Sequence, residues 1–130
     1  MVKKMINCND TKFPIVVMET KDEQTLQDTE KMISFFNSIF ERKESFVILN
    51  YNFDDNDKSE IALSINWFKE NKALFHKYMK ALAVVVNSEN IKDKFQIIYE
   101  RTAQVIYGCE GKVFTSTCEA EGWLVGVLSK

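Results

Sequence analysis

The stretch ALAVVVNS, residues 81–88, places the strongest constraint on how this chain folds. Its side chains are apolar on both alternating faces until Asn87. A strand that is hydrophobic on both faces is usually covered on both sides, which is typical of parallel sheets. Three other short runs are rich in β-branched or aromatic residues and are also predicted as strands. They are residues 13–20 (FPIVVMET), 45–53 (SFVILNYNF) and 111–118 (GKVFTSTC).

A segment with helical periodicity follows each of these strands. Apolar residues recur there at steps of three and four, which places them on one face of a helix. The helices are predicted over about residues 20–43, 57–80 and 88–108, with a last one from residue 116 to about residue 127. The expected capping residues are Thr20 with Glu23, Ser88, and Ser116 with Glu119, and Gly108 is expected to end the third helix.

The alternation gives the order βαβαβαβα. Parallel strands joined by helical crossovers follow from it, because each crossover needs about a dozen residues or more. We therefore predict an α/β fold of four β-α turns with a small, mostly parallel sheet. A length of 130 residues suits a single domain, residues 1–130. Residues 1–12 precede the first predicted strand and are expected to be flexible or a short edge segment.

Composition narrows the class of protein. The net charge is −2 and the charges are mixed along the chain, so no basic face for nucleic acid is expected. No apolar run approaches the roughly 18 residues of a transmembrane helix, and the N-terminus lacks the apolar segment of a secretory signal. The 3 cysteines are irregularly spaced, which argues against a disulfide framework. We expect a cytoplasmic protein without membrane insertion.

The acidic stretch Asp54-Asp55-Asn56-Asp57, with Ser59 after it, is the main candidate for a recognition site. An EF-hand would need a glycine and a late glutamate that this stretch lacks, although weak cation binding stays open. Capping is the simpler interpretation. Asp57 lies at a predicted helix start, where a carboxylate accepts backbone N–H bonds and interacts favourably with the helix dipole. We predict that the loop caps this helix and forms a charged recognition rim.

No catalytic constellation is indicated. His76 is the only histidine, and no nucleophile motif or metal-ligating cysteine lies near it in sequence. The 4 glycines form no phosphate-binding pattern. The chain is therefore predicted not to be an enzyme and to carry no metal or cofactor.

The order strand, D-x-S at a helix start, ALAVVVNS and then VFTSTCEAEGWL resembles the STAS domain. That family includes the cytosolic domains of sulfate transporters and the anti-sigma-factor antagonists. The resemblance extends from Phe13 to Leu124 and is greatest to small stand-alone bacterial STAS-like proteins. It implies a non-catalytic signalling or scaffolding module built on a small parallel sheet.

The resemblance also places Ser59 where the antagonists are phosphorylated. The sequence departs from their D-S-S-G pattern at Lys58 and Glu60. Glu60 and the aspartates before it would repel a phosphate group. We therefore predict that Ser59 is not an efficient phosphoacceptor.

Protein–protein interaction is the first predicted function. Trp67, Phe75 and Tyr78 form a candidate interaction surface for another protein, although aromatic stripes at helical spacing usually face the core. Helices of right-handed crossovers in a sequential sheet all lie on one side. A homodimer is then a simple way to bury the other side.

The alternative function is a binding module for a small ligand. Helix N-termini are expected at the carboxyl ends of the strands, where open α/β sheets bind ligands. Asp54, Asp55 and Asp57 lie at this rim and would repel an anion. The candidates are an uncharged molecule, a nucleotide, a lipid or a divalent cation, of which the uncharged molecule and the cation fit this rim better.

Overall fold

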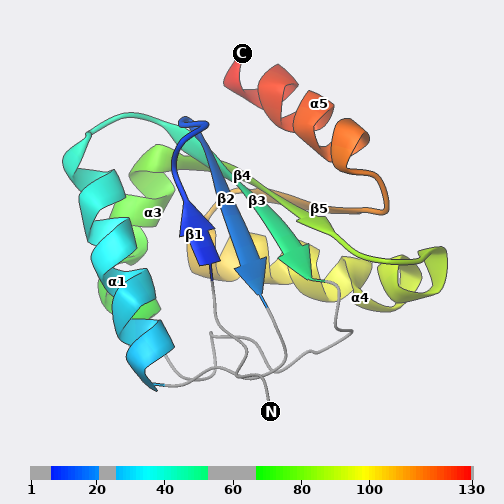
Figure 1. The fold of residues 1–130 in the computed structure, drawn as a ribbon, viewed down its shortest axis with the longest axis horizontal. Helices are drawn as coiled ribbons and strands as arrows, with labels where there is room; N and C mark the ends of the chain where they lie inside the picture. The colour runs from blue at the N-terminus through cyan, green and yellow to red at the C-terminus, as the bar shows by residue number, and fades with distance from the viewer. Residues whose placement is uncertain (1–6, 21–25, 53–66, 130) are drawn as a thin grey trace.

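The computed structural model describes residues 7–20, 26–52 and 67–129 of the chain. Helices and strands alternate in these residues, as the sequence predicts (Figure 1). The strands are β1 (Asn7–Asn9), β2 (Ile15–Thr20), β3 (Phe46–Asn52), β4 (Met79–Val85) and β5 (Glu110–Phe114). The helices are α1 (Leu26–Glu41), α3 (Lys72–Tyr78), α4 (Glu89–Thr102), the π-helical segment η1 (Ala103–Tyr107) and α5 (Thr117–Leu128).

The strands form one five-stranded sheet in the order β1-β2-β3-β4-β5. The pairs from β2 to β5 are all parallel, which confirms the predicted mostly parallel α/β fold. β1 is an addition. It pairs antiparallel with β2, with Cys8 opposite Met18, and turns the start of the chain into a hairpin. The sequence NCN carries no apolar alternation, so sequence patterning does not reveal this strand.

The predicted second helix differs most from the structure. Residues 67–70 are helical, but the helix is interrupted at Asn71, and α3 then ends at Tyr78 rather than Lys80. The Asn71 side chain donates a hydrogen bond to the Trp67 carbonyl oxygen at 2.9 Å. An asparagine side chain that bonds locally to the backbone competes with helical hydrogen bonding. After α3 the chain is extended from Met79, two residues before the predicted strand.

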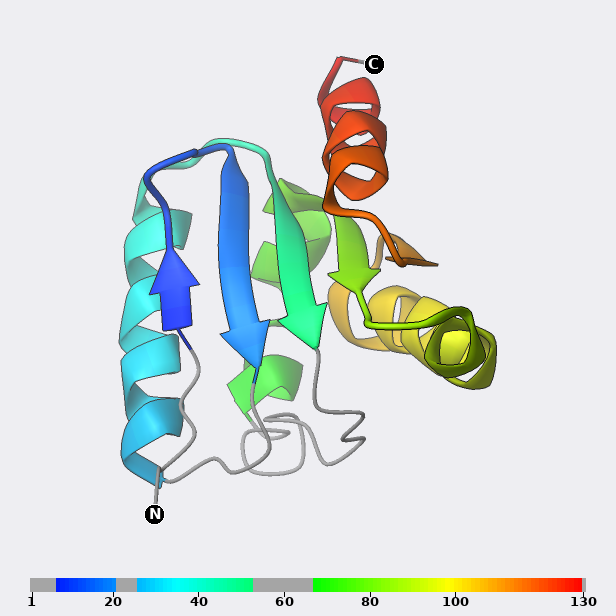
Figure 2. The same ribbon diagram turned by 45° about the vertical axis from the view of Figure 1, so that its right-hand side comes forward.

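The crossover helices cover one face of the sheet, as expected for right-handed crossovers in sequential order. Figure 2 shows α1 behind β1 and α3 behind the central strands. The core on this face joins inward side chains of the strands to apolar residues of α1, α3 and η1. Its fully buried members include Val16, Ile48, Val84, Met32, Phe36, Ile39, Phe75 and Ala103.

The other face is covered by α5, which contacts β3, β4 and β5 and is seen at the upper right of Figure 1. Ala120 and Leu124 of α5 are buried against inward side chains of β3, β4 and β5. A second subunit is therefore not needed to cover this part of the sheet, and that argument for a homodimer is wrong. The reason is that α5 follows the last strand, so no crossover rule fixes its side. Ile15 and Val17 of β2 are only partly buried beside this core.

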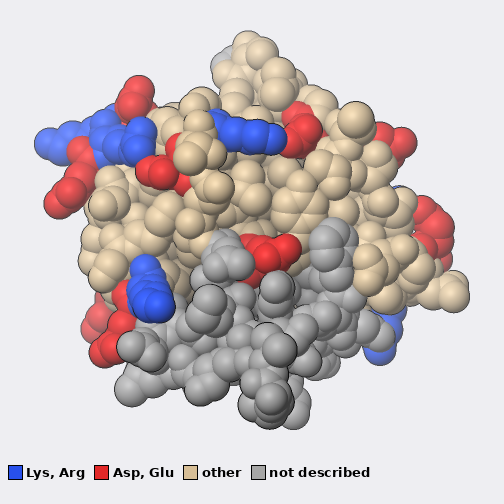
Figure 3. Space-filling view, in the orientation of Figure 1, with Lys and Arg blue, Asp and Glu red and all other residues tan. Residues whose placement is uncertain are grey.

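Charged side chains are sparse on the face that carries α5. Figure 3 shows mostly uncharged residues over its described surface, with charged groups mainly towards the margins. Lys12 and Glu121 form an ion pair, with Nζ and Oε2 3.6 Å apart. It links the β1–β2 turn to α5. An exposed pair of this kind contributes little to stability, so the packing of α5 depends mainly on its apolar side chains.

The helix caps predicted at two serines and one glycine are confirmed. The Ser88 hydroxyl accepts the Ile91 N–H, and the Ser116 hydroxyl accepts the Glu119 N–H, each at 3.3 Å. Gly108 follows η1 with a left-handed backbone at φ 67°, a conformation that favours glycine. The predicted pair Thr20–Glu23 falls partly on residues 21–25, which lie outside the described residues.

Replacing Ser116 with alanine is expected to lower the free energy of unfolding by about 0.5–2 kcal/mol, because an N–H at the start of α5 loses its acceptor. Urea denaturation followed by circular dichroism measures the change. Ser38→Ala is the control, since Ser38 is exposed within α1 and alanine is the better helix former there. Equal stability of the two variants would show that the cap is dispensable.

Candidate functional site

The predicted acidic rim is not placed by the structure. Asp54, Asp55, Asp57 and Ser59 lie outside the described residues. Their roles as helix cap and recognition rim, and the prediction for Ser59, therefore stay predictions. The same holds for the small-ligand site proposed at this rim.

The three aromatic candidates are placed, and they differ. Phe75 is fully buried, so the prediction that it presents an interaction surface is wrong. Its ring lies 5.4 Å from that of Phe36 and 5.1 Å from that of Tyr107, between α1 and η1. Trp67 and Tyr78 are partly buried against the same core. A surface formed by these two residues stays a prediction.

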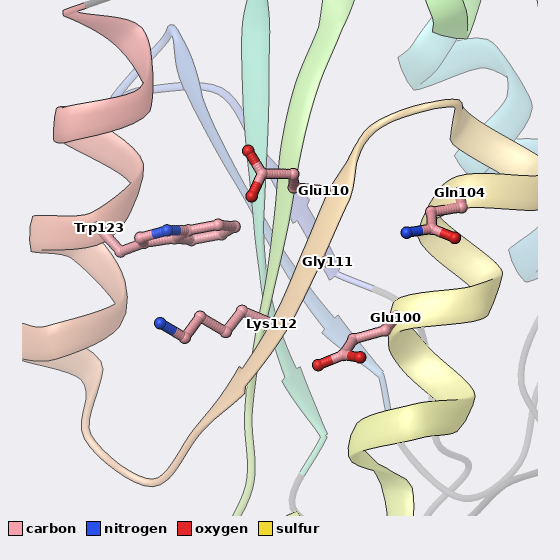
Figure 4. A pocket seen from close by; sticks show the side chains of 6 residues that line it. All are labelled: Glu100, Gln104, Glu110, Gly111, Lys112 and Trp123. Carbon is pink, nitrogen blue, oxygen red and sulfur yellow. The ribbon is translucent and has the colours of Figure 1, made fainter.

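A groove at the outer edge of the sheet is the strongest candidate site among the described residues. It runs along β5, between α4–η1 on one side and α5 on the other (Figure 4). Its volume is about 300 Å³. We call it the β5 edge groove, and its lining residues are Glu100, Gln104, Glu110, Gly111, Lys112 and Trp123.

The backbone of β5 faces this groove at alternate residues. The Phe114 carbonyl oxygen accepts the Val86 N–H at 2.9 Å, so Phe114 directs its backbone groups toward β4. Backbone direction alternates along a strand. Lys112 therefore also faces β4, whereas Gly111 and Val113 direct their N–H and C=O groups outward. In the described part of the chain, no further strand lies on this side of β5.

The side chains of β5 alternate between the two helices. Val113 points to the core beneath α4 and η1, while Phe114 packs against Trp123 of α5, with ring centroids 5.7 Å apart. Lys112 shares the α5 side, and its ammonium group lies 6.0 Å from the Trp123 ring. Glu110 is on the same side because it is two residues from Lys112. The α5 side of the groove thus carries one negative and one positive group.

Gly111 fixes the distance between β5 and α4. A Cβ atom at this position would lie 2.6 Å from the Ala103 Cβ and 2.9 Å from the Tyr99 carbonyl oxygen. Both are closer than normal contacts allow. Glycine therefore lets the strand approach the end of α4 closely. On the far wall, Glu100 is held by a 2.8 Å hydrogen bond from Gln96.

Cys109 lies just before β5 and lines an adjoining hollow with Gln104, Gly108 and Glu110. Burial, together with the nearby charge of Glu110, raises the pKa of the Cys109 thiol from 9.0 to about 12. The thiolate is the nucleophilic form of cysteine, so this geometry does not activate Cys109. Among the described residues, no three His, Cys, Asp or Glu side chains gather as a metal site would require.

Cys109 is expected to react with iodoacetamide at pH 7.5 at least about a hundredfold more slowly in the folded protein than in urea, because only the thiolate attacks. Mass spectrometry of the labelled peptides measures the rate, and Cys118, which is exposed, serves as the internal control. A rapidly labelled Cys109 in the folded protein would contradict its burial.

The raised pKa of Cys109 also predicts that the free energy of unfolding falls between about pH 9 and 12, where the thiol ionises in the unfolded chain but not in the folded one.

Comparison with known proteins now places the fold. No protein-family model matches the sequence, and no curated protein matches it. A solved structure is similar along 95% of both chains, with a TM-score of 0.66 and 17% sequence identity. It is an uncharacterised protein of the DUF3478 family with a SpoIIAA-like fold, from Shewanella loihica PV-4. The chain has a SpoIIAA-like fold. This confirms the fold that the resemblance to STAS domains implies.

The β5 edge groove was not found by sequence reasoning. The strand order β1-β2-β3-β4-β5 makes β5 an edge strand, and this order cannot be read from the local sequence. The local signal is the segment EGKVF, in which a short strand carries two opposite charges on one face. Such charges are common on edge strands, where they limit non-specific pairing.

In the part of the chain described here, no helix combines the length and apolar character needed to cross a bilayer.

Proposed function

We propose that this protein is a non-catalytic module that acts by binding protein, and that the β5 edge groove is its contact surface. The proposal depends on the outward backbone of Gly111 and Val113, which borders the groove between α4–η1 and α5. A sheet edge with exposed backbone donors and acceptors can accept an added strand from a partner. The added strand gains main-chain hydrogen bonds, and the flanking side chains select its sequence.

The polar lining of the groove supports a protein segment as the occupant. The Glu110 and Lys112 side chains can each pair with an opposite charge on the incoming strand. The Trp123 ring offers an apolar surface at the rim, and aromatic side chains are enriched at protein interfaces. A signalling or scaffolding role in the cytoplasm fits a module of this kind, and it requires no chemistry from the groove.

Site-specific photo-crosslinking tests the proposal. A benzophenone amino acid replaces Lys112, and the full-length protein is irradiated in native cell extract. We expect a defined protein adduct from this position. Lys31 is the control position, since it is exposed on α1 and away from β5. Failure to obtain any protein adduct from Lys112, or the same adducts from Lys31, would overturn the proposed function.

A further inference from the structure

We infer that the strand bound in the β5 edge groove is β5 of a second copy of this chain, paired antiparallel about a two-fold axis at Gly111. The inference rests on the proposed function, because it uses the same outward backbone. The two sheets would join into one continuous sheet across the dimer. A two-fold interface of this kind is isologous, which means that both copies use the same surface. Each β5 is therefore the strand added to its partner's sheet and also the edge that accepts its partner's strand.

Charge complementarity selects the antiparallel register. With the axis at Gly111, the carboxylate of Glu110 lies directly opposite the ammonium group of Lys112 from the second copy. Symmetry repeats the pair, so two opposite-charge pairs form on the α5 side of the sheet. Directly opposite residues of antiparallel strands have Cβ atoms about 5 Å apart, and opposite charges there are favourable.

The neighbouring registers are disfavoured by the same charges. Antiparallel pairing must match outward residues with outward residues, so the register changes in steps that move the axis by one residue. An axis at Lys112 would set the two Lys112 side chains opposite each other. An axis at Glu110 would set the two Glu110 carboxylates opposite each other. Like charges directly opposite are destabilising, which leaves Gly111 as the favoured centre.

The backbone geometry at Gly111 fits this centre. Its N–H and C=O groups both point away from β4, as the Phe114–Val86 hydrogen bond establishes through alternation. Two such residues facing each other form a hydrogen-bonded pair that exchanges two N–H···O=C bonds. The groove provides about 300 Å³ beside this edge. Figure 4 shows Glu100 projecting from α4 toward β5, on the other side of the strand from Lys112 and Trp123.

Charge reversal gives a sharp test by sedimentation velocity at micromolar concentration. We expect the unmodified protein to sediment as a species of twice 15.1 kDa. E110K and K112E each convert both opposite-charge pairs into like-charge pairs. Each variant alone is expected to weaken dimerisation at least about tenfold. An equimolar mixture of the two variants recreates two opposite-charge pairs, so it is expected to form the heterodimer, and the double variant E110K/K112E is expected to dimerise with itself.

Two controls separate charge pairing from general effects. K31E reverses an exposed lysine on α1 and is expected to leave the dimer unchanged. Circular dichroism melting curves establish that each variant is folded, since both reversed side chains are exposed. Dimers that resist both single reversals, or variants that do not recover when mixed, would overturn this pairing.

The outcomes also separate this inference from the proposed function. A monomeric unmodified protein overturns the inference. If Lys112 then crosslinks to a different protein, the proposed function stands with another occupant in the groove. If Lys112 crosslinks to a second copy and the reversed variants recover on mixing, both hold. If Lys112 yields no protein adduct, the proposed function itself fails.

Discussion

Replacing Phe75 with alanine is expected to lower the free energy of unfolding by about 3–5 kcal/mol, the usual cost of emptying a fully buried phenylalanine site. The side chain is 0% exposed. Five aromatic rings surround it with centroid distances of 5.0–5.7 Å: Phe36, Phe40, Trp67, Phe68 and Tyr107. They come from separate parts of the chain, so no single neighbour can move to fill the space.

Urea denaturation of Phe75→Ala, monitored by near-ultraviolet circular dichroism, measures this loss. The preceding residue provides the control. Leu74 is 36% exposed on the same short helix. Leu74→Ala therefore removes a large apolar side chain that is less buried, and it is expected to lower the free energy of unfolding by under about 1 kcal/mol. Similar losses for the two variants would mean that Phe75 is not part of the core as described.

Phe75 also illustrates what a sequence pattern cannot predict. Its stripe of apolar residues correctly indicates one helix face, but a stripe cannot say whether that face meets the protein's own core or a partner. The choice depends on α1 and η1, which lie far from Phe75 in sequence and reach it only through the fold. The aromatic content of α1 was visible as a helical pattern, while its contact with α3 was not.

The sheet was predictable because its strands carry strong local signals. The unbroken apolar character of residues 81–86 is explained by cores on both faces, with Leu82 and Val84 toward the crossover helices and Ala81 and Ala83 toward α5. The position of each strand within the sheet has no such local signal in the sequence. The hairpin strand β1 is polar, and its place follows only from pairing with β2.

The candidate site was the least predictable part, for a related reason. An edge is defined by the strand that is missing beside it, and this depends on the order of all five strands. The sequence drew attention instead to the acidic loop, where local composition is unusual. Glu110 and Lys112 alone do not indicate a binding site. They do so only when the strand order shows that β5 is an edge strand with part of its backbone directed outward.

Gly111→Ala is expected to lower the free energy of unfolding by about 1–3 kcal/mol, the range for adding a carbon to a packed site. The new methyl group would lie 2.6 Å from the Ala103 Cβ and 2.9 Å from the Tyr99 carbonyl oxygen. Neither neighbour is the flexible end of a long side chain. Relief therefore requires β5 or the end of α4 to shift as a unit.

A second glycine variant separates this clash from the general effect of adding a methyl group. Gly122 lies in α5, and apart from its chain neighbours and the backbone of its own helix no heavy atom lies within 4 Å of its Cβ position, so Gly122→Ala is expected to stabilise the protein by up to about 1 kcal/mol through helix propensity. The two substitutions are chemically identical and should change the urea midpoint in opposite directions. Ala103→Gly removes the closer contact but itself costs about 1 kcal/mol in a helix, so the double variant Gly111→Ala/Ala103→Gly should lose less stability than the sum of the two single losses, because the two sites are coupled through that contact. If Gly111→Ala were as stable as the unmodified protein, β5 would not be held against α4, and the β5 edge groove would not have the geometry described.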